Sequence, residues 1–198
     1  MADTDAPRGY ARGRERREAI LKAANEVFAA RGFRGASLAT IAERVGLSEP
    51  GLLHHFRSKD ELLLEVLKLR EQHDYDRVED AMGDTAPYLD ALLDLARDNE
   101  ANPGLTRLFA ILGAEAVDAD HPAHEWFRER YRTLRGFVTE HMEEAQERGE
   151  IAAGLDARVL ATQVLAVWDG LQLQWLLDPD EVDLATAFED YLAGLSAR

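Results

Sequence analysis

Apolar residues recur at spacings of three and four along most of the chain, which is the periodicity of amphipathic α-helices. No stretch shows a sustained alternation of apolar and polar residues, as a half-buried β-strand would. In the amino-terminal part, capping serines and closing glycines delimit four predicted helices. These helices cover about 14–31, 37–45, 49–56 and 58–81, and the last opens with the capping box Ser58-x-x-Glu61.

Proline and glycine divide the rest of the chain into five more predicted helices, because both residues interrupt helical structure. These helices lie near 87–101, 104–119, 123–148, 156–177 and 183–196. The pattern therefore predicts an all-α protein of about nine helices. We expect a small three-helix head that is continuous with a larger helical bundle.

A four-residue turn, Val45-Gly46-Leu47-Ser48, separates the second and third predicted helices. Gly46 permits the left-handed backbone of a sharp turn, and Ser48 can cap the third helix. Two short helices joined in this way form a helix-turn-helix, whose second helix enters the DNA major groove. Short helix pairs are also common in all-α proteins, so this geometry alone leaves a purely structural role open.

The charge distribution supports the DNA-binding interpretation, although the formal net charge of the whole chain is −15. Residues 1–60 contain 11 Lys and Arg against 8 Asp and Glu, whereas residues 61–198 contain 12 against 30. Binding to phosphates requires positive charge only where the contact is made. We therefore expect a basic head on an acidic body. The expected domains are a flexible basic arm over 1–13, a DNA-binding domain over 14–60, and a body over 61–198.

The residues of the head also resemble a known family. The resemblance rests on Ile20-Leu-Lys-Ala-Ala, Val27-Phe-Ala-Ala-Arg-Gly-Phe, Ser37-Leu-Ala-Thr-Ile-Ala, Val45-Gly-Leu-Ser and Leu52-Leu-His-His-Phe-Arg-Ser-Lys. With this spacing, residues 14–65 resemble the amino-terminal domain of TetR-family transcriptional regulators. The resemblance implies a homodimer that binds DNA through its first three helices. It also implies that the remaining helices bind a small effector and the partner subunit.

The resemblance implies roles for individual residues of the head. Thr40 and Lys59 are expected to contact phosphates, and His54 and His55 to approach the DNA backbone. The start of the recognition helix is expected to face base edges and consists of Ser48, Glu49, Pro50, Gly51 and Leu52. The apolar spacing places Leu52 in the head core as well. Glu49 and His55 depart from the family pattern, in which a basic residue and a tyrosine are frequent.

The body offers candidates for an effector pocket. Trp168 and Gln172 share one helical face with Trp175, and Asp169 is the only charge between residues 159 and 177. Asp169 could orient a polar or cationic group of the effector, or it could be bonded to a neighbouring helix in the bundle core. Further candidates on the sixth and seventh helices are Phe109, Leu112, Trp126, Phe137, His141 and Met142. An aromatic stripe of this kind is more often core than pocket.

Other classes of function find little support in the sequence. The chain has no cysteine, no glycine-rich phosphate-binding motif and no serine-hydrolase or zinc-protease motif, so we expect neither an enzyme nor a cofactor. His121 and His124 lack further ligands to complete a metal site, and we expect them at a solvated helix start. The polar residues within 159–177 argue against a membrane span, and we expect a cytoplasmic protein.

Together these features predict a ligand-responsive transcriptional regulator. We expect a repressor that binds a palindromic operator in double-stranded DNA and is released by a small molecule of unknown identity. Dimerisation is expected through the last two helices. The alternative is a helical small-molecule-binding or protein-interaction module that does not bind DNA specifically. The sequence specifies neither the effector nor the operator.

Overall fold

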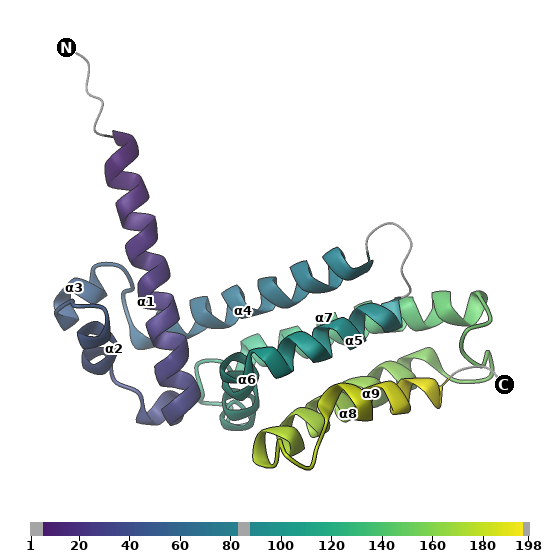
Figure 1. Cartoon of the computed structure of the whole chain (residues 1–198). Helices are drawn as coiled ribbons and strands as arrows, with labels where there is room; N and C mark the ends of the chain where they lie inside the picture. Colours follow the sequence, from purple (N-terminus) through teal and green to yellow (C-terminus); the bar gives the residue numbers. More distant parts are fainter. Residues whose placement is uncertain (1–5, 83–87, 196–198) are drawn as a thin grey trace.

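The computed structural model of the chain describes residues 6–82 and 88–195, which fold into nine α-helices without a β-strand (Figure 1). The helices are α1 (Ala6–Gly35), α2 (Leu38–Arg44), α3 (Glu49–Leu53), α4 (Lys59–Met82), α5 (Tyr88–Ala101), α6 (Pro103–Glu115), α7 (His124–Glu147), α8 (Ala157–Leu177) and α9 (Leu184–Ala193). The expected all-α class is confirmed. None of the helices in the described part of the chain is long and apolar enough to span a membrane.

The first helix is longer at both ends than the apolar pattern predicts. It begins at Ala6, so residues 6–13 of the expected flexible arm are helical, while residues 1–5 lie outside the described part of the chain. Residues 8–18 are mainly arginine and glutamate, which favour a helix but form no apolar stripe that would reveal one. At its other end the helix continues past a kink at Gly32, where φ is 65° and ψ is 178°.

The turn of the helix-turn-helix forms as the sequence predicts. The side chains of Ser37 and Ser48 accept hydrogen bonds from the backbone N–H groups of Thr40 and Gly51, so each serine caps its helix. Gly46 adopts a φ of 65°, and the N–H of Leu47 reaches back to the carbonyl of Ala42 at 2.9 Å. This is a Schellman ending, which a left-handed glycine permits.

Two hydrophobic cores hold the chain together. The first joins α1, α2 and α3 to the first half of α4, and it also includes Leu108, Leu112 and Phe127 from the body. The second lies among α5, α7, α8 and α9, around buried residues such as Met142 and Phe188. Figure 1 shows α4 running from the head along the body, and the expected domain boundary at residue 60 falls in its first turn.

Candidate DNA-binding and effector sites

The recognition helix α3 presents polar and small residues to solvent. Ser48, Glu49 and Pro50 are exposed, and Gly51 is half-buried. Leu52 was expected among the residues that face base edges, but its side chain is fully buried in the first core. Its expected DNA contact is therefore wrong, because Leu52 is the apolar residue by which this short helix packs against the rest of the head.

Thr40, His54 and His55 lie around this helix with their polar atoms within reach of solvent. Thr40 is half-buried, and its hydroxyl lies 2.8 Å from that of Ser37. His54 is exposed and His55 is half-buried, and their rings pack edge to face at a centroid distance of 5.9 Å. All three residues remain candidates for contacts to the DNA backbone.

Lys59 makes internal contacts that the sequence did not reveal. Its ammonium group donates hydrogen bonds to the carbonyl oxygens of Phe33 at 2.8 Å and Ala36 at 3.0 Å. It also lies 4.2 Å from the centre of the Phe33 ring, in a cation–π contact. Lys59 therefore ties the end of α1 to the start of α4, and its side chain would have to leave these partners to contact a phosphate.

Several arginines of the head are also occupied within the protein. Arg16 donates to the carbonyl of Val45 at 3.1 Å, and Arg17 donates to that of His55 at 3.0 Å. These two side chains therefore satisfy carbonyls at the ends of α2 and α3. Arg57, which is exposed just before α4, makes no side-chain hydrogen bond or ion pair with the described residues. The sequence reasoning overlooked it as a candidate phosphate contact.

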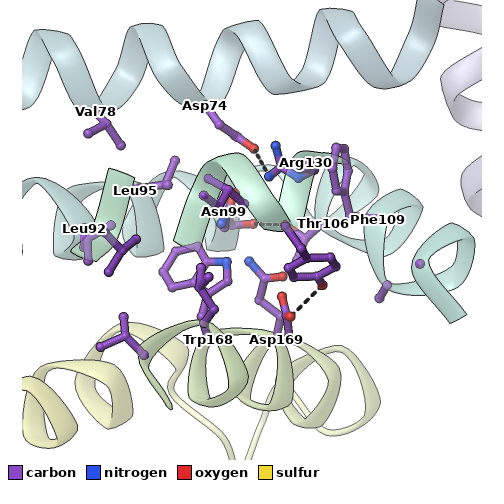
Figure 2. A pocket seen from close by; sticks show the side chains of 18 of the residues that line it. Asp74, Val78, Leu92, Leu95, Asn99, Thr106, Phe109, Arg130, Trp168 and Asp169 are labelled. Carbon is purple, nitrogen blue, oxygen red and sulfur yellow. Dashed lines mark hydrogen bonds and ion pairs between the residues drawn. The ribbon is translucent and has the colours of Figure 1, made fainter. Parts of the chain in front are cut away.

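The body encloses a cavity of about 290 Å³ between α4, α5, α6, α7, α8 and α9 (Figure 2). Five of the predicted effector residues line it, namely Phe109, Phe137, Trp168, Asp169 and Gln172. The remaining candidates do not. Trp126 packs against the first core, Met142 is fully buried in the second, and His141 stacks on Tyr88 at a centroid distance of 4.3 Å. Leu112 and Trp175 are core residues as well.

One wall of the cavity is polar and was missed by the sequence analysis. The guanidinium of Arg70, with a side chain only 3% exposed, lies 2.9 Å from a carboxylate oxygen of Asp74 and donates to the amide oxygen of Asn99. Asn99 is itself buried, and its backbone carbonyl accepts a hydrogen bond from the hydroxyl of Thr106 at 3.3 Å. A signal for this wall exists in α4, where Arg70 and Asp74 interrupt an apolar stripe between Leu67 and Val78.

Arg130 completes this wall from α7. It pairs with Glu71 at 3.0 Å, its second amino group lies 3.8 Å from Asp74, and its guanidinium lies 4.7 Å from the centre of the Phe109 ring. Burial raises the pKa of the Asp74 carboxyl, and the two guanidiniums beside it oppose that shift. The polar wall thus consists of two cations, each with its own carboxylate partner.

Asp169 lies on the opposite side of the cavity, on α8. The hydroxyl of Tyr131 donates a hydrogen bond to its carboxylate at 2.6 Å, and a dashed line at Asp169 in Figure 2 marks this bond. Asp169 is therefore both a cavity residue and bonded to a neighbouring helix, so the two interpretations of the sequence are compatible. Desolvation by the cavity walls raises the pKa of the Asp169 carboxyl, and the hydrogen bond from Tyr131 opposes this shift.

The head and the body meet where α1 ends against α6. The carboxylate of Glu115, the last residue of α6, accepts a hydrogen bond from the backbone N–H of Phe33 at 2.8 Å. The absence of a side chain at Gly32 permits this close approach, since a Cβ atom at this position would overlap Glu115 Oε1. Residues of α6 just before Glu115 line the cavity, among them Gly113 and Ala114.

His121 belongs to this junction and is 5% exposed, so the expectation that it lies at a solvated helix start is wrong. Its ring packs edge to face against Phe33 at 5.1 Å, and its Nδ1 accepts from the N–H of Ala123 at 3.2 Å. No group of metal-ligating side chains occurs among the residues that the structure describes. His121 is therefore a core residue of the junction.

We expect the stability of the protein to fall at mildly acidic pH because of His121. Burial lowers the pKa of this imidazole below its ordinary value of 6.5, although the nearby carboxylate of Glu115 opposes the shift. As pH falls through 6.5 and below, His121 is protonated in the unfolded chain but stays neutral in the folded protein. The free energy of unfolding therefore decreases over this pH range. Thermal unfolding of the protein and of His121→Asn between pH 8 and pH 5 checks this. A variant with the same pH dependence as the parent would contradict it.

Comparisons with known proteins agree with this geometry. Residues 20–66 match the model of bacterial regulatory proteins of the tetR family, and residues 88–197 match that of the carboxy-terminal domain of BetI-type transcriptional repressors. The transcriptional regulator PksA of Bacillus subtilis is 30% identical over 176 residues, which is 85% of this chain and 82% of PksA. TtgR of Pseudomonas putida is 30% identical over 186 residues, which is 90% of this chain and 88% of TtgR.

Solved structures share the fold over nearly the whole chain. SmeT, solved as a complex with triclosan, has a TM-score of 0.76 at 18% identity, over 92% of its own length and 93% of this chain. The carboxy-terminal family match spans more than half of the residues, and the head carries the helix-turn-helix described above. The chain therefore belongs to the TetR family of transcriptional regulators, the ligand-responsive DNA-binding proteins that the head resembles.

Proposed function

We propose that this regulator is a repressor, which binds a palindromic operator as a dimer and leaves it when a small molecule fills the cavity of the body. The observation that carries the proposal is the position of α6. One face of this helix lines the cavity, and its last residue, Glu115, holds the end of α1 in the DNA-binding head. An occupant of the cavity that moves α6 would therefore also move the head.

The DNA contacts in this proposal come from the exposed surface of α2 and α3 and from the loop before α4. Thr40, His54 and Arg57 offer a hydroxyl, an imidazole and a guanidinium to phosphates, while Glu49 and Ser48 lie at the start of α3. Glu49 can accept a hydrogen bond from a cytosine amino group in the major groove. We propose Arg57 in place of Lys59 as the main cation of this surface.

The outer face of α8 supports the proposed dimer. Val159, Leu173 and Leu177 have exposed fractions of 51%, 52% and 77%, which is unusual for large aliphatic side chains on one helix of a small protein. Gly170 lies among them and has open space at its Cβ position. A second copy placed against α8 and α9 would cover these residues and hold two heads at a constant separation, as two half-sites require.

The proposal is tested by the binding of the purified protein to the DNA that flanks its own gene. We expect sequence-selective binding whose affinity falls steeply with salt, since the contacts release counterions. Thr40→Ala should weaken operator binding about two- to tenfold, the value of one hydrogen bond of about 0.5–1.5 kcal/mol. It should shift the unfolding curve only slightly, because the partner of its hydroxyl within the protein is the exposed side chain of Ser37. Fluorescence anisotropy with labelled operator and urea unfolding measure the two effects.

The control distinguishes a DNA contact from a structural one. Lys59→Ala should lower both the operator affinity and the unfolding midpoint, because Lys59 holds the carbonyls of Phe33 and Ala36. If the protein binds unrelated DNA as tightly as its flanking DNA, it is not an operator-specific repressor. The alternative, a helical module that binds small molecules without specific DNA recognition, would then apply.

A further inference from the structure

The residues that line the cavity indicate which chemical class of effector it binds, and this inference rests on the proposed function of the cavity. Each of the six helices around it contributes an aromatic ring, namely Tyr75, Tyr88, Phe109, Tyr131, Trp168 and Phe188. Aliphatic side chains, among them Val78, Leu92 and Leu95, gather at one end in Figure 2, away from Asp169. The cavity therefore suits a molecule with an apolar body and one polar end.

The two cations of the cavity are already neutralised. Arg70 lies 2.9 Å from Asp74, and Arg130 lies 3.0 Å from Glu71 and is stacked on the Phe109 ring. Among the described residues, the Nε and Nη1 atoms of Arg70 have no hydrogen-bond partner, but both atoms have almost no accessible surface that a ligand could contact. An anionic ligand would have to displace these ion pairs in order to bind.

Asp169 has no such partner. Among the residues that the structure describes, no basic nitrogen lies within 4.0 Å of its carboxylate, whose hydrogen bond comes from the neutral hydroxyl of Tyr131. Arg130 acts on it only at longer range, and Asp169 itself is exposed to solvent, so its carboxylate is accessible to a ligand. Trp168 precedes it on α8 and contributes an aromatic face to the same cavity.

We infer that the effector is a hydrophobic organic cation, a protonated amine or a quaternary ammonium on an aryl or alkyl body. Its charged nitrogen binds the carboxylate of Asp169 beside the rings of Trp168 and Tyr131, and its apolar body lies toward Leu92 and Val78. A carboxylate with an aromatic wall is the arrangement that binds such cations, because the ring faces and the carboxylate both attract positive charge. The bound cation supplies the counter-charge that Asp169 lacks in the free protein.

Three probes with the same apolar body test this inference, namely phenylbutylamine, phenylbutanol and phenylbutyrate. Binding to the full-length protein is measured by isothermal titration calorimetry at neutral pH without DNA. We expect the amine to bind most tightly and Asp169→Asn to weaken it about tenfold, the loss of one charge-assisted contact of about 1.4 kcal/mol. The amide oxygen that this substitution introduces would still accept from Tyr131, and Asp180→Asn in the exposed turn after α8 serves as the matched loss of one negative charge.

A second variant separates the charge of Asp169 from its structural role. Tyr131→Phe removes the hydroxyl that donates to the carboxylate and should leave the amine bound at least as tightly as in the parent. If the pair were merely structural, this variant would weaken the binding of all three probes alike. Tightest binding of phenylbutyrate, an unchanged preference in Asp169→Asn, or failure of all three probes to bind at millimolar concentration would each overturn the inference. Operator binding is measured separately, so the cation can fail as ligand while the repressor proposal stands.

Discussion

Asp74→Ala is expected to lower the free energy of unfolding by about 3–5 kcal/mol, the typical cost of removing one partner of a buried ion pair. The substitution leaves the guanidinium of Arg70 in the cavity wall without its carboxylate, 2.9 Å away in the parent, and with only the amide of Asn99 as a partner. It also removes the longer contact to Arg130 at 3.8 Å. Urea unfolding followed by circular dichroism measures the loss.

Two variants show whether the stranded charge is the cause. Arg70→Met should lower the free energy of unfolding much less than Asp74→Ala does, because Asp74 keeps the guanidinium of Arg130 as a neighbour. The double variant Arg70→Met/Asp74→Leu should recover most of the stability, since a buried ion pair contributes little beyond an apolar pair of similar size. If the double variant is as unstable as Asp74→Ala, the ion pair does not explain the loss.

Gly32→Ala is expected to lower the free energy of unfolding by about 2.5–6 kcal/mol and to loosen the head from the body. The backbone at Gly32 has a φ of 65° and a ψ of 178°, a region that essentially only glycine occupies, and strain of about 1–3 kcal/mol follows for any other residue. The new methyl group would also overlap Glu115 Oε1 and would displace this carboxylate from the N–H of Phe33. Breaking a hydrogen bond to a charged group adds about 1.5–3 kcal/mol.

The double-mutant cycle with Glu115→Ala separates these two costs. Without the Glu115 carboxylate, Gly32→Ala retains the backbone strain but meets no steric obstacle, so it should cost less than in the parent. Both single variants should also weaken the effect of an effector on operator affinity, because the hydrogen bond between Glu115 of α6 and Phe33 of α1 is lost. If Gly32→Ala lowers the free energy of unfolding by the same amount in the parent and in Glu115→Ala, Glu115 plays no part in the effect of the substitution at Gly32.

Much of the head could be predicted because its signals are local. Ser37, Gly46 and Ser48 each act on backbone groups within a few residues, so their roles in capping and turning follow from the sequence. The partners of Lys59 and Arg17 could not be predicted, since they lie 26 and 38 residues away along the chain. Which residues a long basic side chain contacts depends on the packing of α1 against α4.

The body illustrates the same difference between periodicity and packing. The helical stripes identified the helices and placed Phe109, Trp168, Asp169 and Gln172 on inward faces, but a stripe does not distinguish a filled core from a cavity. Met142 and Trp168 both lie on such stripes, yet one is fully buried and the other lines the cavity. Volume that remains empty between helices depends on how six helices fit together.

The sequence by itself determined the all-α class, the helix-turn-helix and the family, because apolar period, capping and turn residues act over short distances. Only the tertiary structure decided that Leu52 is core, that Lys59 braces α1, and that Arg70 and Asp74 form the polar wall of a cavity. It also decided that Glu115 joins the cavity helix to the head. The physical reason is that burial, ion pairing and empty volume arise between residues far apart in the chain.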